Sequence, residues 1–142
     1  MLYLHPVLQV GCLLVAWGAV YLGWGRVRER HLGAEGAFPR RSHILLGKLA
    51  LGGWLGGVAL GTWVAFTYWQ GAFPPVLHAR LAVIMVPLLA WGIVSGLFLQ
   101  FVPRPRRWLP VLHGLGNLLL VGLGTAQLYT GYLVLRDLVW TR

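Results

Sequence analysis

Four long apolar stretches limit what this chain can fold into. They cover residues 5–25, 43–69, 78–102 and 111–135. At a helical rise of about 1.5 Å per residue, each can cross a hydrocarbon core about 30 Å thick. Of the 142 residues, 58% are hydrophobic and 11% are charged, whereas roughly one quarter of a soluble domain is charged. We therefore expect one all-α domain, residues 1–142, that forms a four-helix bundle within a membrane.

The pattern of these stretches argues against a transmembrane β-barrel. Barrel strands are about 10 residues long and alternate apolar with polar side chains, whereas the stretches here neither alternate nor break at that interval. Short connections place consecutive helices antiparallel to one another. The sequence thus predicts an antiparallel up-down bundle with both termini on the same side of the membrane.

Most basic residues lie in two of the three connections. The net charge is +9, and the second connection, residues 70–77, carries no charged residue. The arginines of the first and third connections are Arg26, Arg28, Arg30, Arg40, Arg41, Arg104, Arg106 and Arg107. Basic loops stay in the cytoplasm, so both termini and the turn at Phe73–Pro75 are expected on the non-cytoplasmic side. Topology and attraction to lipid headgroups explain this charge, and no nucleic-acid partner is predicted.

One histidine occurs near the start of each apolar stretch. These residues are His5, His43, His78 and His113, at nearly equal intervals of 35 to 38 residues. Successive antiparallel helices start on alternate sides of the membrane. His5 and His78 should therefore meet at one face, and His43 and His113 at the other.

The type and number of these ligands predict haem. Histidine within a membrane span is costly and by default a functional hypothesis. Two imidazoles per face are too few for a structural zinc site, which takes four nitrogen or sulfur ligands, but they suffice when a porphyrin supplies four nitrogens. The sequence contains no Cys-x-x-Cys-His motif for covalent attachment. We predict two b-type haems, while the alternative that the histidines only reach interfacial water stays open.

Cationic residues near the histidines are candidate partners for haem propionates. Arg40 and Arg41 directly precede His43, and Arg80 follows His78 by two residues on the opposite face. For the loop arginines, membrane topology and lipid contact are the alternative explanation.

Two further polar residues lie inside the stretches. Lys48 could extend to the interface, contact a propionate or contact a quinone headgroup. Asn117 lies one helical turn after His113 on the same helix face, where it could contact a haem edge. Hydrogen bonding between helices is the alternative function for Asn117.

The two halves of the chain resemble each other. A proline-arginine pair precedes both His43 and His113, and a pseudo-twofold axis along the membrane normal would superimpose one hairpin on the other. Paired histidines would then lie on diagonally opposite helices. A flat cofactor between four helices also needs positions without side chains. Candidates for these are Gly47, Gly52, Gly92, Gly96 and Gly116.

The four histidines, their intervals and the predicted topology resemble the cytochrome b561 group of transmembrane di-haem cytochromes and the related small bacterial membrane proteins. The resemblance implies that His5 and His78 hold the non-cytoplasmic haem and that His43 and His113 hold the cytoplasmic one. No counterpart of the family's basic ascorbate-binding segments is recognisable. A quinol or a partner protein is therefore at least as suitable an electron donor as ascorbate.

The expected function is one-electron transfer in a plasma (inner) or photosynthetic membrane, as a subunit or shuttle of a membrane oxidoreductase or quinone-linked system. With both axial positions occupied by histidine, neither iron would have an open coordination site, and electron exchange would be outer-sphere. Two alternatives remain. One is a haem-free scaffold, assembly subunit or small transporter, and the other is a protein with one haem and a quinone site.

Overall fold

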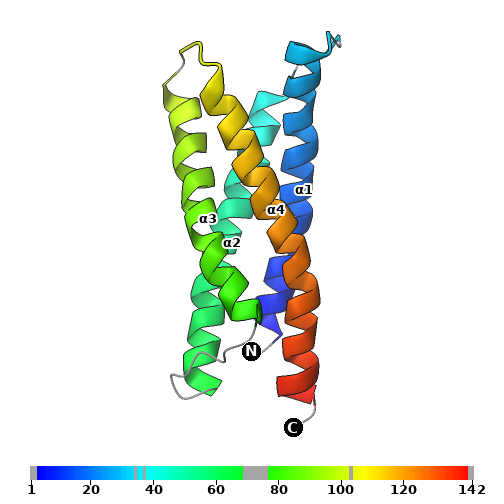
Figure 1. Cartoon of the computed structure of the whole chain (residues 1–142), viewed down its shortest axis with the longest axis vertical. Coiled ribbons are helices and arrows are strands. Elements are labelled where there is room, and N and C mark those ends of the chain that lie inside the picture. The colour runs from blue at the N-terminus through cyan, green and yellow to red at the C-terminus, as the bar shows by residue number, and fades with distance from the viewer. Residues whose placement is uncertain (1–2, 34, 37, 69–76, 103, 141–142) are drawn as a thin grey trace.

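The computed structural model describes residues 3–33, 35–36, 38–68, 77–102 and 104–140, and this part of the chain is all helical apart from short connections. The elements are α1 (Leu4–His31), α2 (Arg40–Tyr68), α3 (Leu77–Phe101), α4 (Trp108–Leu135) and a short π-helical turn, η1 (Arg136–Trp140). Each of the four α-helices is long and apolar enough to cross a membrane. Figure 1 shows neighbouring helices running in alternating directions, with both ends of the chain at one end of the bundle. The predicted all-α bundle is confirmed to this extent.

The first helix is longer than the sequence pattern predicts. It continues from residue 25 to His31, so the arginines between these positions lie on the helix and not in a connection. Arginine is a good helix former, and the helix ends only where Gly33 adopts a left-handed φ of 62°. The other helices begin and end within three residues of the predicted bounds. The predicted turn at Phe73–Pro75 lies outside the described residues.

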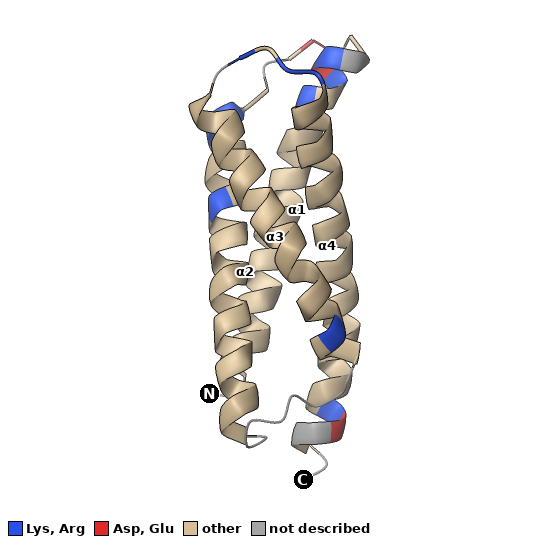
Figure 2. Ribbon diagram, turned by 60° about the vertical axis from the view of Figure 1, so that its left-hand side comes forward, with Lys and Arg blue, Asp and Glu red and all other residues tan. Residues whose placement is uncertain are grey.

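Apolar side chains cover the outside of the bundle. Leu14, Val83 and Val94 are 69%, 70% and 63% exposed, respectively, although each lies well inside its helix. Such a surface suits contact with lipid chains and would be unfavourable in water. Lysine and arginine gather mainly at the end that carries the α1–α2 and α3–α4 connections, as Figure 2 shows. This distribution is that of a multi-pass membrane protein.

Glycines allow α1 and α2 to approach closely. Three of them, each one helical turn from the next, form a continuous strip on α2 that receives side chains of α1. The contacts pair Gly53 with Cys12, Gly57 with Gln9 and Gly61 with His5. His5 is therefore the last member of a regular packing series.

Packing is closer within each hairpin, α1 with α2 and α3 with α4, than between the two hairpins. Between the hairpins, the buried ring of Trp54 on α2 lies against Gly124 on α4. A Cβ atom on Gly124 would lie 3.0 Å from that ring. The interface between hairpins thus has an aromatic centre, and the histidines lie toward its two ends.

Candidate functional site: two histidine pairs

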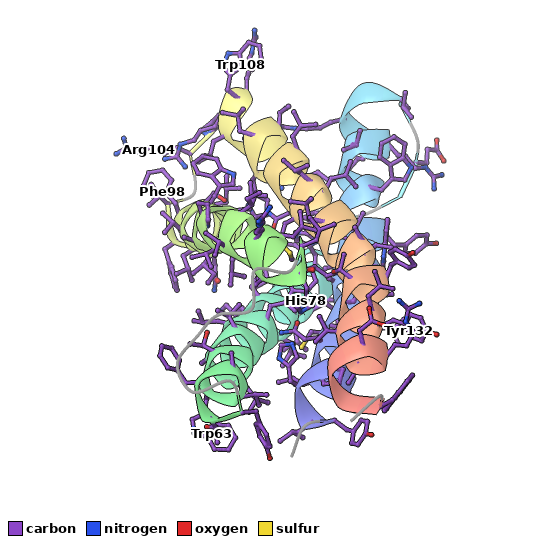
Figure 3. All side chains as sticks on the ribbon, turned by 60° about the horizontal axis from the view of Figure 1, so that its bottom comes forward. Trp63, His78, Phe98, Arg104, Trp108 and Tyr132 are labelled. Carbon is purple, nitrogen blue, oxygen red and sulfur yellow. The ribbon has the colours of Figure 1, made fainter. Side chains whose placement is uncertain are left out.

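The structure brings the four span histidines together as two pairs. The ring centres of His5 on α1 and His78 on α3 are 6.3 Å apart, with an angle of 86° between the ring planes. His43 on α2 and His113 on α4 are 6.4 Å apart at 78°. All four are half-buried, and Figure 3 shows His78 inside the bundle. These are the predicted pairs, each formed by alternate helices from different hairpins.

In the first hairpin, backbone carbonyls orient the imidazoles. His5 Nδ1 lies 2.9 Å from the carbonyl oxygen of Gly57, and His43 Nδ1 lies 2.9 Å from that of Ala19. A carbonyl oxygen only accepts, so Nδ1 of each neutral ring must carry the hydrogen. The lone pair is then on Nε2, which is free to bind a metal.

In the second hairpin, a threonine hydroxyl has the same function for His78. The Nδ1 atom of His78 lies 3.0 Å from Thr130 Oγ1. The hydroxyl of Thr130 donates to Gln127 Oε1 at 2.6 Å, and the amide of Gln127 donates to the backbone oxygen of His78 at 3.1 Å. Because the hydroxyl hydrogen is directed to Gln127, the hydroxyl oxygen accepts from Nδ1–H of His78.

Ser95 has this function for His113. Its Oγ atom lies 2.8 Å from His113 Nδ1 and donates to the backbone oxygen of Trp91 at 2.5 Å. Asn117 lies beside the same ring, donates to the backbone oxygen of His113 at 2.7 Å, and places its Nδ2 atom 3.3 Å from Nδ1. Asn117 is thus part of the polar surroundings of His113, and contact with a haem edge stays a prediction.

Each histidine ring lies on a glycine of the other helix in its hairpin. A Cβ atom added to these glycines would lie only 2.8 to 3.3 Å from the ring atom Cε1. The pairs are His5 on Gly61, His43 on Gly23, His78 on Gly131 and His113 on Gly96. We call these four residues the seat glycines. Any larger residue at a seat would displace the ring or the helix.

The seat glycines follow a spacing that the sequence prediction missed. In every helix, the seat glycine comes 18 residues after the histidine of that same helix. Eighteen residues are five turns of about 3.6 residues, so the histidine and the glycine share one face. When two antiparallel helices share this spacing, the histidine of each helix lies opposite the glycine of the other. The repeated interval was available in the sequence as a signal.

The acceptors of the Nδ1 hydrogen also differ between the hairpins, and the sequence beside the seat glycines explains the difference. Ser95 and Thr130 directly precede the seat glycines of the second hairpin, while the corresponding positions of the first hairpin are Leu22 and Leu60. Without a hydroxyl at these positions, the first hairpin uses backbone carbonyls instead.

The structure distributes the five glycines predicted as cofactor contacts among different functions. Gly96 is a seat glycine, whereas Gly92 lies against Asn117 and Leu51. Gly116 lies against the ring of Trp91. Cβ atoms added to the remaining two, Gly47 and Gly52, would have no described neighbour within 4 Å.

The predicted cationic partners do not converge on the imidazoles. Arg40, Arg41 and Lys48 line an open groove on the outside of α2 and α3, whose lining includes neither histidine of the nearby pair. Arg40 donates to the backbone oxygen of Gln100 at 3.2 Å. Arg80 is exposed on α3.

A cation that the sequence analysis named only as a loop arginine lies closer to the pair of His43 and His113. The guanidinium of Arg26 stacks over Phe38 at 5.5 Å from the ring centre, and Phe38 in turn lies 5.4 Å from the ring of His43. Arg26 follows the seat glycine Gly23 by three residues, which places it about one turn further along the same helix face. The interval between Gly23 and Arg26 becomes a signal in the sequence only once Gly23 is known to contact His43.

Each site offers two imidazoles, which suits a metal that arrives with further ligands in a cofactor. Among the described residues, no group of three or more histidine, cysteine or acidic side chains could hold a metal ion. An ion about 2.0 Å from one nitrogen of each imidazole would separate the ring centres by about 6 Å, which agrees with 6.3 and 6.4 Å. The planar tetrapyrrole of haem supplies four further nitrogens, so these residues fit bis-imidazole haem.

No family model, curated protein or solved structure matches this chain. The chemical interpretation of the site therefore depends on its own geometry.

Proposed function

We propose that this chain is a membrane cytochrome that holds one b-type haem between His5 and His78 and a second between His43 and His113. The observation that carries the proposal is the hydrogen bonding and spacing of the imidazole rings. In each of two pairs, both Nδ1 atoms are hydrogen-bonded within a hairpin, which leaves the Nε2 lone pairs for a metal. The ring centres are 6.3 and 6.4 Å apart, a separation suited to one shared metal ion. Haem held by these residues would supply a one-electron iron couple.

The protein would contribute orientation and ligand basicity. A hydrogen bond from Nδ1–H fixes the tautomer and ring direction of a ligating histidine and raises its basicity as a ligand. The seat glycine allows the ring to lie against the neighbouring backbone, which limits its rotation. Together these contacts keep the proton on Nδ1 and the lone pair on Nε2.

The separation of the pairs suits electron transfer across a membrane. His5 and Gly23 share a helix and are 18 residues apart, and Gly23 contacts the ring of His43. At about 1.5 Å per residue, the pairs are about 27 Å apart along the bundle. This length is close to the thickness of a hydrocarbon core, about 30 Å.

The charge distribution favours one orientation within this proposal. Basic connections remain in the cytoplasm, which would place the pair of His43 and His113 near the cytoplasmic surface and the termini on the other side. Electrons would pass to or from a partner oxidoreductase, an electron carrier or a quinone in an inner or photosynthetic membrane.

The proposal is tested by counting haem in detergent-purified protein with a pyridine haemochrome assay. We expect two b haems per chain, falling to about one in His43→Ala and in His78→Ala. His31→Ala, which changes the histidine outside both pairs, is the control and should retain two. A helical, monodisperse preparation without haem would overturn the proposal in favour of a haem-free scaffold or transporter. One haem in the unmodified chain would favour a single haem with a quinone site.

A further inference from the structure

A second candidate site lies on the outside of the bundle, where the first turns of α2 pass the last turn of α3. The groove there has a volume of about 510 Å³ and is open to the surroundings. Its principal lining residues are Arg40, Arg41, Leu45, Lys48, Gln100 and Phe101. Neither histidine pair contributes to it.

The charge in this groove is entirely positive. Arg41, Leu45 and Lys48 recur at the helical spacing of four and three residues, so the two cations lie on one exposed face of α2. One guanidinium N–H of Arg40 donates to the backbone oxygen of Gln100 at the end of α3, and the other N–H groups of this guanidinium remain available. Three cations thus converge at one opening.

In the described part of the chain, no acidic side chain lines the groove beside these cations. The chain has three acidic residues, and none of them lines the groove. Asp137 pairs with Arg136 at the far end of α4, while Glu29 and Glu35 belong to α1 and its connection to α2. A counter-ion for the groove must therefore come from outside the chain.

The position of Lys48, further into the predicted membrane span, strengthens the need for an external anion. It lies eight residues after Arg40 in α2, or about 12 Å deeper along the helix, on a lipid-facing surface. A lysine at this depth extends its stem along the helix to bring the ammonium to the interface. That direction leads to Arg41, where like charges repel unless an anion lies between them.

The groove also has apolar lining residues. Leu45 is 58% exposed and Phe101 is 68% exposed, and both side chains would contact acyl chains. A free phosphate ion would leave these surfaces unused, and a neutral quinone headgroup would leave the cations unpaired. The combination matches a ligand with a phosphodiester anion and hydrocarbon chains.

We propose that the groove of Arg40, Arg41 and Lys48 binds the headgroup of an anionic phospholipid. The guanidinium groups of Arg40 and Arg41 would donate to the phosphate oxygens at the mouth of the groove, and the ammonium of Lys48 would contact the phosphate from below. Basic pockets between membrane helices on the cytoplasmic side are suited to such headgroups. The site does not depend on haem binding.

Native mass spectrometry of the detergent-solubilised full chain tests the site directly. The protein is titrated with phosphatidylglycerol, with phosphatidylcholine of the same acyl chains, and with inorganic phosphate. We expect phosphatidylglycerol to bind at least tenfold more tightly than phosphatidylcholine and inorganic phosphate to leave its occupancy unchanged. The triple variant R40Q/R41Q/K48Q should weaken phosphatidylglycerol binding by about tenfold or more, since each cation near a headgroup contributes roughly a fivefold factor.

The matched control is R28Q/R30Q/R107Q, which removes the same charge from exposed arginines of the same end that do not line the groove. It should bind phosphatidylglycerol as the unmodified chain does. Equal losses in both triple variants would show general attraction to the basic end and overturn the site, as would equal affinity for the two lipids. Helical circular dichroism and a single peak in size exclusion establish that each variant is folded before titration. If the groove triple variant fails this check, Lys48→Gln alone, expected to lose about fivefold, replaces it.

Discussion

The ring of His43 on α2 lies on Gly23 of α1, which is the residue 18 positions after His5 on its own helix. The same relationship holds in reverse, because His5 lies on Gly61, 18 positions after His43. Each helix of the hairpin therefore provides an imidazole at one end and a seat at the other. The second hairpin repeats the arrangement through Gly96 and Gly131.

A side chain at a seat glycine should remove the haem that the overlying histidine would bind. In Gly61→Val, the Cβ atom alone would lie 2.8 Å from Cε1 of His5, so the ring must leave its position opposite His78. We expect about one haem per chain by the haemochrome assay. Gly56→Val carries the same substitution on α2 at a position with nothing within 4 Å, and it should keep two. Two haems in both variants would contradict the seat function.

Removing a hydroxyl partner of Nδ1 should change the potential of one haem only. Ser95→Ala deprives His113 of its acceptor, which lowers the basicity of the ligand and favours reduced iron. We expect the midpoint potential of that haem to rise by up to about 60 mV, the equivalent of a tenfold shift in a one-electron equilibrium. Optical redox titration measures this change. Ser42→Ala, at an exposed position of α2, is the control and should leave both potentials unchanged.

Thr130→Val should have the corresponding effect at the other pair, because Thr130 accepts from His78. The potential shifted by this variant should be the one that Ser95→Ala leaves unchanged. Thr125→Val removes a hydroxyl that bonds only to its own helix, at the backbone oxygen of Val121, and should shift neither potential. If both variants moved the same haem, the assignment of the pairs to separate sites would be wrong.

Stability of the bundle centre should depend on Trp54 and not on its lipid-facing counterpart. Trp54 is 5% exposed, whereas Trp63 on the same helix is 48% exposed. Trp54→Ala leaves a cavity against Gly124, and we expect a loss of about 3 kcal/mol in the free energy of unfolding. Trp63→Ala should cost less than about 1 kcal/mol. Unfolding in mixed detergent followed by circular dichroism compares them, and similar losses would contradict the packing described.

Haem should stabilise the bundle by joining two hairpins that pack less closely with each other than internally. A ligand that binds only the folded state raises the free energy of unfolding by RT ln(1 + [L]/Kd), where [L] is the free ligand concentration. Adding haem to protein produced without it should raise the melting temperature by about 10 °C. The double variant H5A/H43A, with one histidine missing from each pair, should show no such rise. A rise of equal size in that variant would indicate binding elsewhere.

The sequence predicts the helices and the histidine pairs because these follow from large, simple constraints. Apolar length determines each membrane helix. Because helix direction alternates, His5 can meet only His78, and His43 only His113, among the four histidines at the helix starts. Apolar character predicts an end of α1 near residue 25, because it is lost at Arg26, but the helix ends at His31. The backbone continues until a glycine permits a left-handed turn.

The surroundings of the histidines were harder to predict. With 20 glycines in the chain, no single one is informative, and Gly23 or Gly131 becomes distinctive only through its interval from a histidine. Hydroxyl partners such as Ser95 depend on the register between helices, which apolar patterning does not determine. The groove beside Lys48 likewise depends on where α3 ends relative to α2.

The interval between histidine and seat glycine has a mechanical consequence. Each end of the bundle uses all four helices, two for imidazoles and two for seats, and the same helices exchange these functions at the other end. Inserting one residue between His43 and Gly61 would rotate one end of α2 against the other by about 100°. The two ends of α2 could then no longer both keep their register, so one insertion would misalign at least one pair. The distance between the pairs is therefore set by helical pitch and cannot be adjusted by changing a loop.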